Sequence, residues 1–422
     1  MKYCTRCLYP ANHPLNITFD EEGVCSGCRI HEEKDELDWA AREHRLRHLL
    51  ESYKSSSGAL YDCIIPVSGA RDSYFIVHTV KNIYGLNPLL VQYNCHYNSL
   101  LGHRNVAYLR TIFDCDYYAQ VLSPDVVKRI TRRTLDKRAS LYWHCIAGQT
   151  VLPVQVAVRY KIPLIVWGAH QGIDQVGMYS HLDEVEMSRK YRKDHDLMGL
   201  EAEDLVSEAD NLPERDLQPL FYPHDKDIER VGIRGIYLNN YLCWDTKAQH
   251  EQMIEQYGYE TSPQTRTFDT YSDVDSLIYN DLHDYIKYLK FGYSKVTDHA
   301  CREIRLRRMT REQGQTLVRD YSDRPAKYTE LFLKWLEIDR KNLFQTVDRF
   351  RDLTIWQCDD GEGWKLKDRS DLTPCSDQHK KVALSLRETK CNFKITKSRD
   401  PSALDNQYVL ITRGYVDNHA HA

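Results

Sequence analysis

The sequence contains no long apolar run. Its first residues, MKYCTRC, lack the hydrophobic core of a signal peptide, and no uninterrupted stretch approaches the roughly 20 apolar residues that a membrane-spanning helix needs. No internal repeat or low-complexity tract is evident, so a repeat array is not expected. These absences predict a soluble, cytoplasmic protein without a membrane span.

The sequence also lacks a strong excess of either charge. Its 422 residues carry a net charge of −4 and the pI is about 6.5, which argues against nucleic acid as the main partner. Two basic runs, residues 128–138 and 302–311, could face an anionic ligand, although a solvated helix face is the simpler explanation of the first. The length and the 42% hydrophobic content predict a buried core and two or three units.

Thirteen cysteines are present, and disulfides rarely persist in the cytoplasm, so we expect reduced thiols and a metal. Cys4 and Cys7 form one C-x2-C pair, and Cys25 and Cys28 form a second. Four thiolates at this spacing predict a tetrahedral Zn²⁺ site without an open ligand position, hence a structural metal. A redox pair is less favoured, because no thioredoxin-like pattern surrounds these residues.

From residue 61 the sequence alternates between short apolar runs and helical patterns. Strands are predicted at 61–67, 88–95, 117–122 and 162–168, and helices at 72–84, 102–113, from 123 onward and at 147–161. This order predicts an α/β fold, a doubly wound parallel sheet with helices on both faces. Ligands bind such sheets outside the carboxyl ends of the strands, where loops 68–73 and 168–177 should lie.

The loop after the first predicted strand, within PVSGARDSYF, combines small residues with a following helix, which favours an anion such as phosphate. It matches neither the Walker A formula nor the G-x-G-x-x-G formula. It resembles S-G-G-x-D-S, the PP-loop of the ATP pyrophosphatases, at Ser68, Gly69, Asp72 and Ser73. Arg71, at the variable position, could contact phosphate oxygens.

Ala70 departs from this pattern, which has a second glycine there. Its Cβ penalises a positive φ and could crowd a phosphate, so either the backbone tolerates alanine or nucleotide binding is weakened. An ordinary strand-to-helix turn is the alternative explanation of the loop.

Further motifs narrow the resemblance. The C-x2-C pairs and the PP-loop are followed by WHCIAGQT (143–150), IVWGAHQGIDQVG (165–177), RGIYLNNYLCWD (234–245) and YLKFGYSKVTDHACREIR (288–305). Over most of its first 320 residues the sequence is similar to the N-acetyl sugar amidotransferase family. The family acts in bacterial surface-polysaccharide assembly, such as that of lipopolysaccharide O-antigen, where an acetamido group on an activated sugar becomes an acetamidino group.

The resemblance implies ATP and Mg²⁺ as cofactors and a nucleotide-activated sugar, expected to be a 2,3-diacetamido uronic acid, as substrate. The acetamido oxygen would attack the α-phosphorus of ATP, pyrophosphate would leave, and ammonia would then displace AMP. The predicted catalytic residues are Arg71, Asp72 and Ser73. The predicted ATP-binding residues are Ser68, Gly69, Ala70, Arg71, Asp72, Ser73, Gly168, His170, Gln171 and Asp174. For His170 a structural histidine is an equal alternative.

Predicted substrate contacts form two groups. His144 and Gln149 open a helix that could line the same cleft, beside Cys145, which is more often a small core residue than a nucleophile. The second group lies in the helical half and could bind the sugar carboxylate or diphosphate: Lys290, Lys295, Asp298, His299 and Arg305. A solvated helix face is a nearly equal explanation of this second group.

The supply of ammonia requires a partner. Lys2 excludes an amino-terminal nucleophilic cysteine, and no cysteine lies in a Gly-x-Cys-x-Gly elbow with an evident His and Glu pair. The resemblance therefore implies a separate glutaminase subunit and a cyclase-like subunit that supply ammonia.

Four regions are predicted along the chain. They are a zinc-binding knuckle and helix at 1–55, an ATP-binding domain at 56–245 with a charged, mobile flap at about 183–230, a helical substrate or partner region at 246–340, and a tail of unknown role at 341–422. The tail contains short strand signals at IWQ, GWKLK and YVLITRGY.

Two alternative functions remain. A tRNA 2-thiolation enzyme shares the PP-loop and often the zinc knuckles, but it typically needs a further cysteine pair, and the remaining candidates are isolated in sequence: Cys63, Cys95, Cys115 and Cys145. A catalytically weakened, zinc-stabilised scaffold is the second alternative, for which Ala70 would be the evidence.

Overall fold

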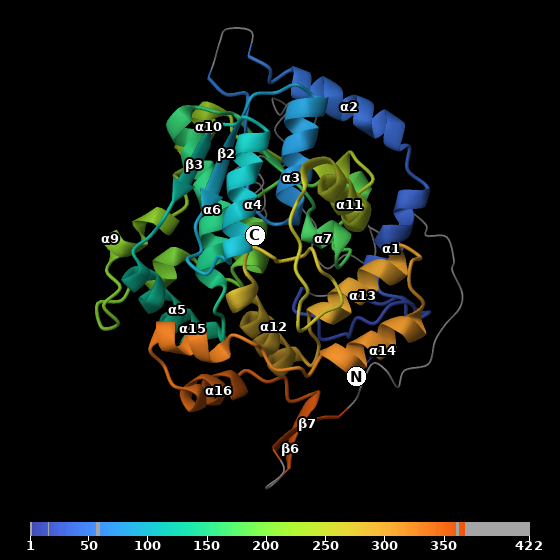
Figure 1. Ribbon diagram of the computed structural model, residues 1–422, viewed down its shortest axis with the longest axis vertical. Coiled ribbons are helices and arrows are strands. Elements are labelled where there is room, and N and C mark those ends of the chain that lie inside the picture. Colours follow the sequence, from blue (N-terminus) through green and yellow to red (C-terminus); the bar gives the residue numbers. More distant parts are fainter. Residues whose placement is uncertain (1, 16, 56–59, 360–362, 368–422) are drawn as a thin grey trace.

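The computed structural model describes residues 2–15, 17–55, 60–359 and 363–367 (Figure 1). Its main sheet consists of β1 (Cys63–Pro66), β2 (Pro88–Tyr93), β3 (Tyr117–Gln120), β4 (Leu164–Trp167) and β5 (Arg234–Tyr237). All neighbouring strands are parallel, in the order β3-β2-β1-β4-β5. The chain thus winds outward from β1 to β3, returns, and winds outward again through β4 and β5, so the topological switch point lies between β1 and β4.

Helices cover both faces of this sheet. They are α3 (Arg71–Val77, continued as a π-helical turn at His78–Ile83), α4 (Leu100–Ile112), α5 (Pro124–Arg138), α6 (Trp143–Tyr160) and α11 (Thr246–Tyr257). Ile64 of β1 packs in the core cluster that includes α5 and α6, whereas its neighbour Ile65 packs in the cluster that includes α3, α4 and α11. Successive strand residues face opposite sides, so burial of both faces explains the unbroken apolar run. The predicted doubly wound α/β fold is confirmed.

In the amino-terminal unit Cys4 and Cys7 lie in a loop, Cys25 caps α1 (Ser26–Glu32) and Cys28 lies in its first turn, and α2 (Trp39–Glu51) follows. This unit is not isolated. Leu8 and Val24 share a core cluster with Val296 and Ile304, which lie almost 300 residues later in the sequence. Because the cysteine-containing loop is too small to form its own core, it packs against the carboxyl-terminal helices.

The region after β5 is largely helical, as predicted. It comprises α12 (Leu277–Phe291), α13 (Lys295–Arg305), α14 (Arg311–Tyr321), α15 (Thr329–Leu336) and α16 (Arg340–Asp348). An antiparallel hairpin of β6 (Trp356–Asp359) and β7 (Gly363–Leu366) follows and corresponds to the IWQ and GWKLK signals. The YVLITRGY signal lies outside the described residues.

The charged segment predicted as a mobile flap contains the short helices α8 (Arg189–Tyr191), α9 (Glu214–Leu217) and α10 (Asp225–Val231), and α7 (Gln171–Asp174) precedes it. Leu197, Leu205 and Leu217 are fully buried in the main core cluster. These leucines anchor the segment to the sheet domain, whereas a mobile flap would lack such core contacts. Among the described residues, no helix combines the length and apolar character needed to cross a membrane.

Candidate active site

The loop between β1 and α3 makes a tight turn at Gly69, whose φ is +79°. A Cβ at this position would lie 2.4 Å from Cγ2 of Val106 and 2.9 Å from the carbonyl oxygen of Gly102. Both the backbone conformation and the close approach of α4 therefore require glycine here.

Ala70 has φ −78° and ψ 175°, an extended conformation that any L-residue adopts. The strain that the sequence led us to consider at this position is absent, because the left-handed turn falls entirely on Gly69. The backbone tolerates alanine.

Internal hydrogen bonds hold the loop. The Ser68 N–H donates to Oγ of Ser73 at 3.2 Å, and the Ala70 N–H donates to Oγ of Ser68 at 3.1 Å. Ser73 is buried and Asp72 is half-buried in the first turn of α3. The side chain of Arg71 lies outside the described part of the structure. The loop is thus preorganised at the amino end of a helix, where the dipole and the first N–H groups favour an anion.

A second loop joins β4 to α7 on the other side of the switch point. Gly168 lies against α3, since a Cβ there would lie 3.0 Å from Cδ1 of Ile76. His170 caps α7, because its Nδ1 accepts the Gly172 N–H at 3.0 Å, and burial lowers the pKa of this histidine to about 3. Only 1% of His170 is exposed, which matches the structural alternative. Gln171, in contrast, is exposed.

Asp174, at the end of α7, contacts the amino-terminal unit. We call this unit, residues 2–55, the zinc unit after the metal that its four paired cysteines are predicted to bind. Its Oδ1 lies 3.1 Å from Nζ of Lys34, which also donates to the carbonyl of Trp244 at 2.9 Å. Burial opposes ionisation of Asp174, but the charge of Lys34 lowers its pKa to about 2. The loop after β4, the zinc unit and the segment after β5 therefore meet at one ion pair.

A cavity of about 290 Å³ lies beside this junction. Its wall includes Arg6, Lys34, Cys243, Arg305 and Arg307. A separate pocket of about 10 Å³, room for a single water, shares Lys34 and Arg305 with it and is also lined by Asp174, Trp244 and Arg302. Pockets at the junction of several units are common ligand sites.

The four paired cysteines are fully or almost fully buried, with all four Sγ atoms within 4.8 Å of one another. Sγ of Cys4 lies 3.9 Å from that of Cys28, and Sγ of Cys7 lies 3.6 Å from that of Cys25. Tetrahedral zinc with bonds of about 2.3 Å needs sulfurs about 3.8 Å apart. The Cys25 N–H donates to Sγ of Cys4 at 3.2 Å, as backbone amides do around bound thiolates. The geometry fits a metal, with no open position.

Arg305 connects this cysteine cluster to the loop after β4. Its Nη1 donates to the Gln175 carbonyl at 2.6 Å, while its Nη2 lies 3.5 Å from Sγ of Cys25. Asp298 lies nearby and accepts hydrogen bonds from the Tyr9 hydroxyl at 3.0 Å and from Nε2 of Gln175 at 3.1 Å. Both residues join α13 to the zinc unit and to the end of α7.

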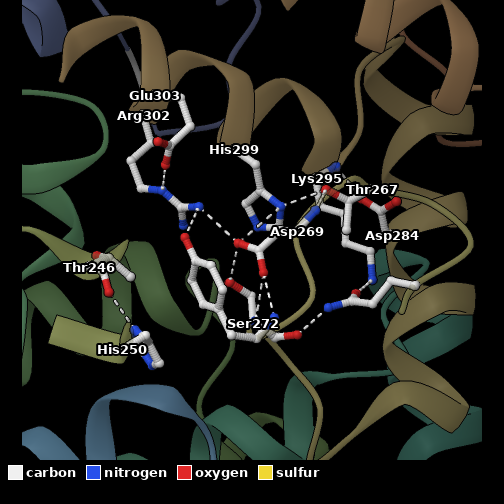
Figure 2. Close-up of polar contacts among 12 residues, drawn as sticks. Thr246, His250, Thr267, Asp269, Ser272, Asp284, Lys295, His299, Arg302 and Glu303 are labelled. Carbon is white, nitrogen blue, oxygen red and sulfur yellow. Dashed lines mark hydrogen bonds and ion pairs between the residues drawn. The ribbon is translucent and has the colours of Figure 1, made fainter. Parts of the chain in front are cut away.

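Lys295 and His299 belong to a different, buried network around Asp269 and Asp284 (Figure 2). Nδ1 of His299 lies 2.7 Å from the Thr267 hydroxyl, and Nζ of Lys295 forms an ion pair with Asp281 at 3.0 Å. Figure 2 shows Arg302 directed at Asp269, to which it donates at 2.8 Å. Although burial opposes ionisation, the charges of His299 and Arg302 hold the pKa of Asp269 far below its usual range.

Lys290 is separate from both groups. Its ammonium donates to the Arg138 carbonyl at 2.8 Å, and burial lowers its pKa to about 8. The five polar residues predicted in the helical half thus divide among three places, because different faces of α12 and α13 pack against different neighbours.

His144 lies inside the core, with Nε2 3.1 Å from the Tyr97 hydroxyl and Nδ1 3.4 Å from the Tyr93 hydroxyl. It is fully buried, and burial lowers its pKa to about 3, so it does not face a cleft. Gln149 is half-buried, and its amide lies 3.6 Å from Sγ of Cys95.

The structure also indicates residues that the sequence reasoning missed. The Ser99 N–H donates to the Asp275 carbonyl at 2.7 Å, and a Cβ on Gly102 would lie 2.5 Å from Cα of Asp275. Because Gly69 also packs on Gly102, the segment around Asp275 and the loop after β1 contact the same turn of α4. The D-V-D sequence at 273–275 was the one sequence feature that could have indicated this segment. Lys34 had no signal beyond its charge.

Comparisons with known proteins address the resemblance. Residues 265–370 match the family model described as "LPS biosynthesis protein WbpG-like, C-terminal domain". This match confirms the predicted resemblance to surface-polysaccharide biosynthesis over that part of the chain. No curated protein matches the chain.

Two solved structures show partial similarity. The NH3-dependent NAD synthetase from Campylobacter jejuni has a TM-score of 0.26 and 11% identity, and the match covers 34% of this chain and 62% of that one. The NMN synthetase from Francisella tularensis has a TM-score of 0.25 and 12% identity, and the match covers 54% of this chain and 99% of that one.

Proposed function

We propose that this protein is an ATP-dependent amidotransferase that converts an acetamido group of a nucleotide-activated sugar into an acetamidino group, releasing AMP and pyrophosphate. The observation that carries the proposal is the loop after β1, a preorganised anion site at the switch point of the sheet. The match of residues 265–370 to a lipopolysaccharide biosynthesis domain supports a sugar as the acceptor.

The reaction begins with activation of the amide. The acetamido oxygen attacks the α-phosphorus of ATP, an O–P bond forms, and the bond to the departing pyrophosphate breaks. In this proposal Ser68, Ser73 and the first N–H groups of α3, which lie together at the amino end of that helix, would hold the anionic leaving group. Mg²⁺ would neutralise part of the phosphate charge, and Asp72 in the first turn of α3 is the expected ligand.

Ammonia then adds to the activated carbon, loses a proton, and the C–O bond breaks. The amidine is released, and the original acetamido oxygen remains on AMP. This chain's role is to bind, orient and screen the reactants, and no covalent enzyme intermediate is needed. We propose that a glutaminase subunit with a cyclase-like companion supplies the ammonia in the cytoplasm.

The metal site has a supporting role in this proposal. Four thiolates would hold Zn²⁺ as a structural ion, which fixes the amino-terminal loop against α13 and α7. With no open position, the site supplies folding energy rather than chemistry.

The tRNA thiolation alternative depends on a reactive cysteine pair. Cys95 and Cys145, isolated in sequence, are neighbours in the fold, but burial and a hydrogen bond with Cys95 raise the pKa of the Cys145 thiol well above its ordinary value. A buried thiol of this kind is a poor sulfur nucleophile. The observation therefore favours the amidotransferase.

The test follows the acetamido oxygen. The zinc-loaded protein is incubated with ATP, Mg²⁺, ammonium chloride and a UDP-linked diacetamido uronic acid labelled with ¹⁸O in its acetamido groups. We expect AMP that carries ¹⁸O, and Asp72→Asn should abolish its formation. AMP formation only with tRNA and a sulfur donor would favour thiolation, and absence of AMP under all conditions would leave the scaffold alternative.

A further inference from the structure

The cavity at the junction of the zinc unit, the sheet domain and α13 has a cationic wall. Its lining carries four cationic side chains, Arg6, Lys34, Arg305 and Arg307, against two carboxylates, Glu32 and Asp35. Lys34 is also paired with Asp174 just outside this lining, so four cations face three carboxylates, a formal excess of one positive charge around a volume of about 290 Å³. That volume is close to the lower end of the range for small-molecule sites, about 300 Å³.

The cations are held in place by their neighbours. Arg307 forms an ion pair with Asp35 at 2.6 Å, and Arg6 pairs with Glu32. Lys34 is 8% exposed and is fixed between Asp174 and the Trp244 carbonyl. Because Arg6 and Lys34 are buried and already have a fixed direction, little of their side-chain entropy remains to be lost when a ligand binds, whereas Arg307 is exposed.

Packed side chains connect the cavity to the helix that follows the loop after β1. A separate pocket of about 10 Å³, lined by Asp174 and Trp244, shares Lys34 and Arg305 with the cavity. Trp244 contacts Phe75 of α3, with ring centroids 5.5 Å apart, and α3 begins at the loop after β1. The cavity wall and the proposed ATP loop are therefore joined by packing, and a ligand in the cavity would lie on the far side of Trp244 from α3.

We propose that this cavity binds the acidic acceptor sugar, with its cationic wall recognising either the carboxylate of a uronic acid or the diphosphate of the nucleotide carrier. The identity of the ligand as the acceptor rests on the proposed function. The zinc unit then forms one wall of a substrate site, through Arg6 and Lys34, in addition to stabilising the fold.

Cys243 provides a direct probe, because it is exposed and lines the cavity, whereas the exposed Cys358 lies in the β6–β7 hairpin and does not line it. The zinc-loaded full chain is treated with iodoacetamide, and alkylation of both thiols is followed by peptide mass spectrometry. Three additives are compared: UDP-glucuronate, UDP-N-acetylglucosamine and free N-acetylglucosamine. We expect UDP-glucuronate to slow alkylation of Cys243 at least about fivefold, with Cys358 unchanged, whereas the neutral sugar gives no protection.

The two UDP-sugars identify the anion that is recognised. Protection by both assigns the diphosphate to the cationic wall, and protection by UDP-glucuronate alone assigns the carboxylate. Arg307→Gln should raise the half-protecting concentration about fivefold, while Arg319→Gln, an exposed substitution on α14 outside the cavity, should not change it. Lys34→Gln is the second variant, and it should raise the half-protecting concentration more than Arg307→Gln does.

Equal protection by the neutral sugar, or no protection by either UDP-sugar, would overturn the proposal. If ¹⁸O-labelled AMP forms while Cys243 remains unprotected, the amidotransferase function stands and the acceptor binds elsewhere. Protection of Cys243 without AMP formation would support the anion site and contradict the proposed amidotransferase reaction.

Discussion

At the residue scale, Gly69 and Ala70 share the turn of the PP-loop unequally. Gly69 has the positive φ and touches α4, whereas Ala70 is extended. The S-G-G-x-D-S pattern alone cannot say which of its two glycines is required for conformational reasons, because that depends on the neighbouring helix.

Gly69→Ala should therefore destabilise the protein and impair ATP binding. The left-handed conformation costs about 1–2 kcal/mol for alanine, and the clash with Val106 adds about 1–3 kcal/mol. Urea unfolding and ATP–pyrophosphate exchange measure the two effects. Ala70→Gly is the matched control, expected to change stability by less than about 1 kcal/mol and to leave turnover unchanged. A large gain in turnover for this control would contradict the assignment of Ala70 as an accommodated residue.

His170 makes stability depend on pH. Its folded pKa of about 3 lies below the unfolded value of about 6.5, so its contribution is present above pH 6.5 and is lost progressively as the pH falls toward 3. Between pH 7 and 5 this one residue should reduce the unfolding free energy by about 2 kcal/mol. His170→Asn retains an acceptor for the Gly172 N–H and should lack this loss. Urea unfolding of both proteins at the two pH values gives the difference, and equal pH dependence would show that His170 is not buried as a neutral ring.

At the element scale, α13 determines how the zinc unit and the loop after β4 are joined. Sequence reasoning placed Lys295, Asp298, His299 and Arg305 in one substrate group, because they follow one another on a predicted helix. The structure places them on different faces, where Asp298 and Arg305 meet α7 and the zinc unit and the other two meet the Asp269 network. Helical periodicity gives the face of a residue, whereas the packing partner of that face depends on the tertiary structure.

Arg305→Lys should loosen the end of α7. The two Nη atoms of the Arg305 guanidinium contact the Gln175 carbonyl and the Cys25 sulfur simultaneously. The single ammonium of a lysine cannot contact both. We expect faster amide hydrogen exchange at residues 171–178 and release of zinc at a lower chelator concentration. Arg319→Lys on α14 is the control, because its guanidinium is exposed and bonds only locally to Thr316. Unchanged exchange in Arg305→Lys would refute a connecting role for this side chain.

At the scale of the whole molecule, the zinc unit and the carboxyl-terminal helices form one core cluster. Leu8 and Tyr9 pack with Val296 and Ala300, and α12 residues such as Leu282 join the cluster on one face of the sheet. The boundaries predicted at residues 55 and 245 thus separate regions that bury each other, so these regions are not independent folding units.

A chain that ends at residue 245 should fail to fold. Removal of α12 to α16 exposes the buried side chains of both core clusters and leaves the cysteine loop without its support. We expect insolubility and loss of bound zinc, measured by solubility on expression and by metal content. A chain that ends at Lys367 keeps all of these contacts and is the matched control. Recovery of a soluble, zinc-loaded 1–245 fragment would show that the amino-terminal part folds alone.

The sequence by itself determined the local elements and the short-range sites. Apolar periodicity was sufficient for four of the five strands of the parallel sheet, although β5 was not predicted, and the C-x2-C spacing was sufficient for the metal cluster, because each strand and each cysteine pair is contained within a few consecutive residues. The loop after β1 was predicted as an anion site for the same reason, since a strand, a tight turn and a helix follow directly in the chain.

Only the tertiary structure decided which residues pack against these elements. The pairing of Lys34 with Asp174, the burial of His144 and His170, and the cavity beside Arg305 all join residues more than 100 positions apart or depend on which helix covers a face. Desolvation and ion pairing depend on such long-range neighbours, and no local pattern encodes them. Thus the loop could be predicted as a phosphate site from the sequence, whereas the residues that surround it came from the fold.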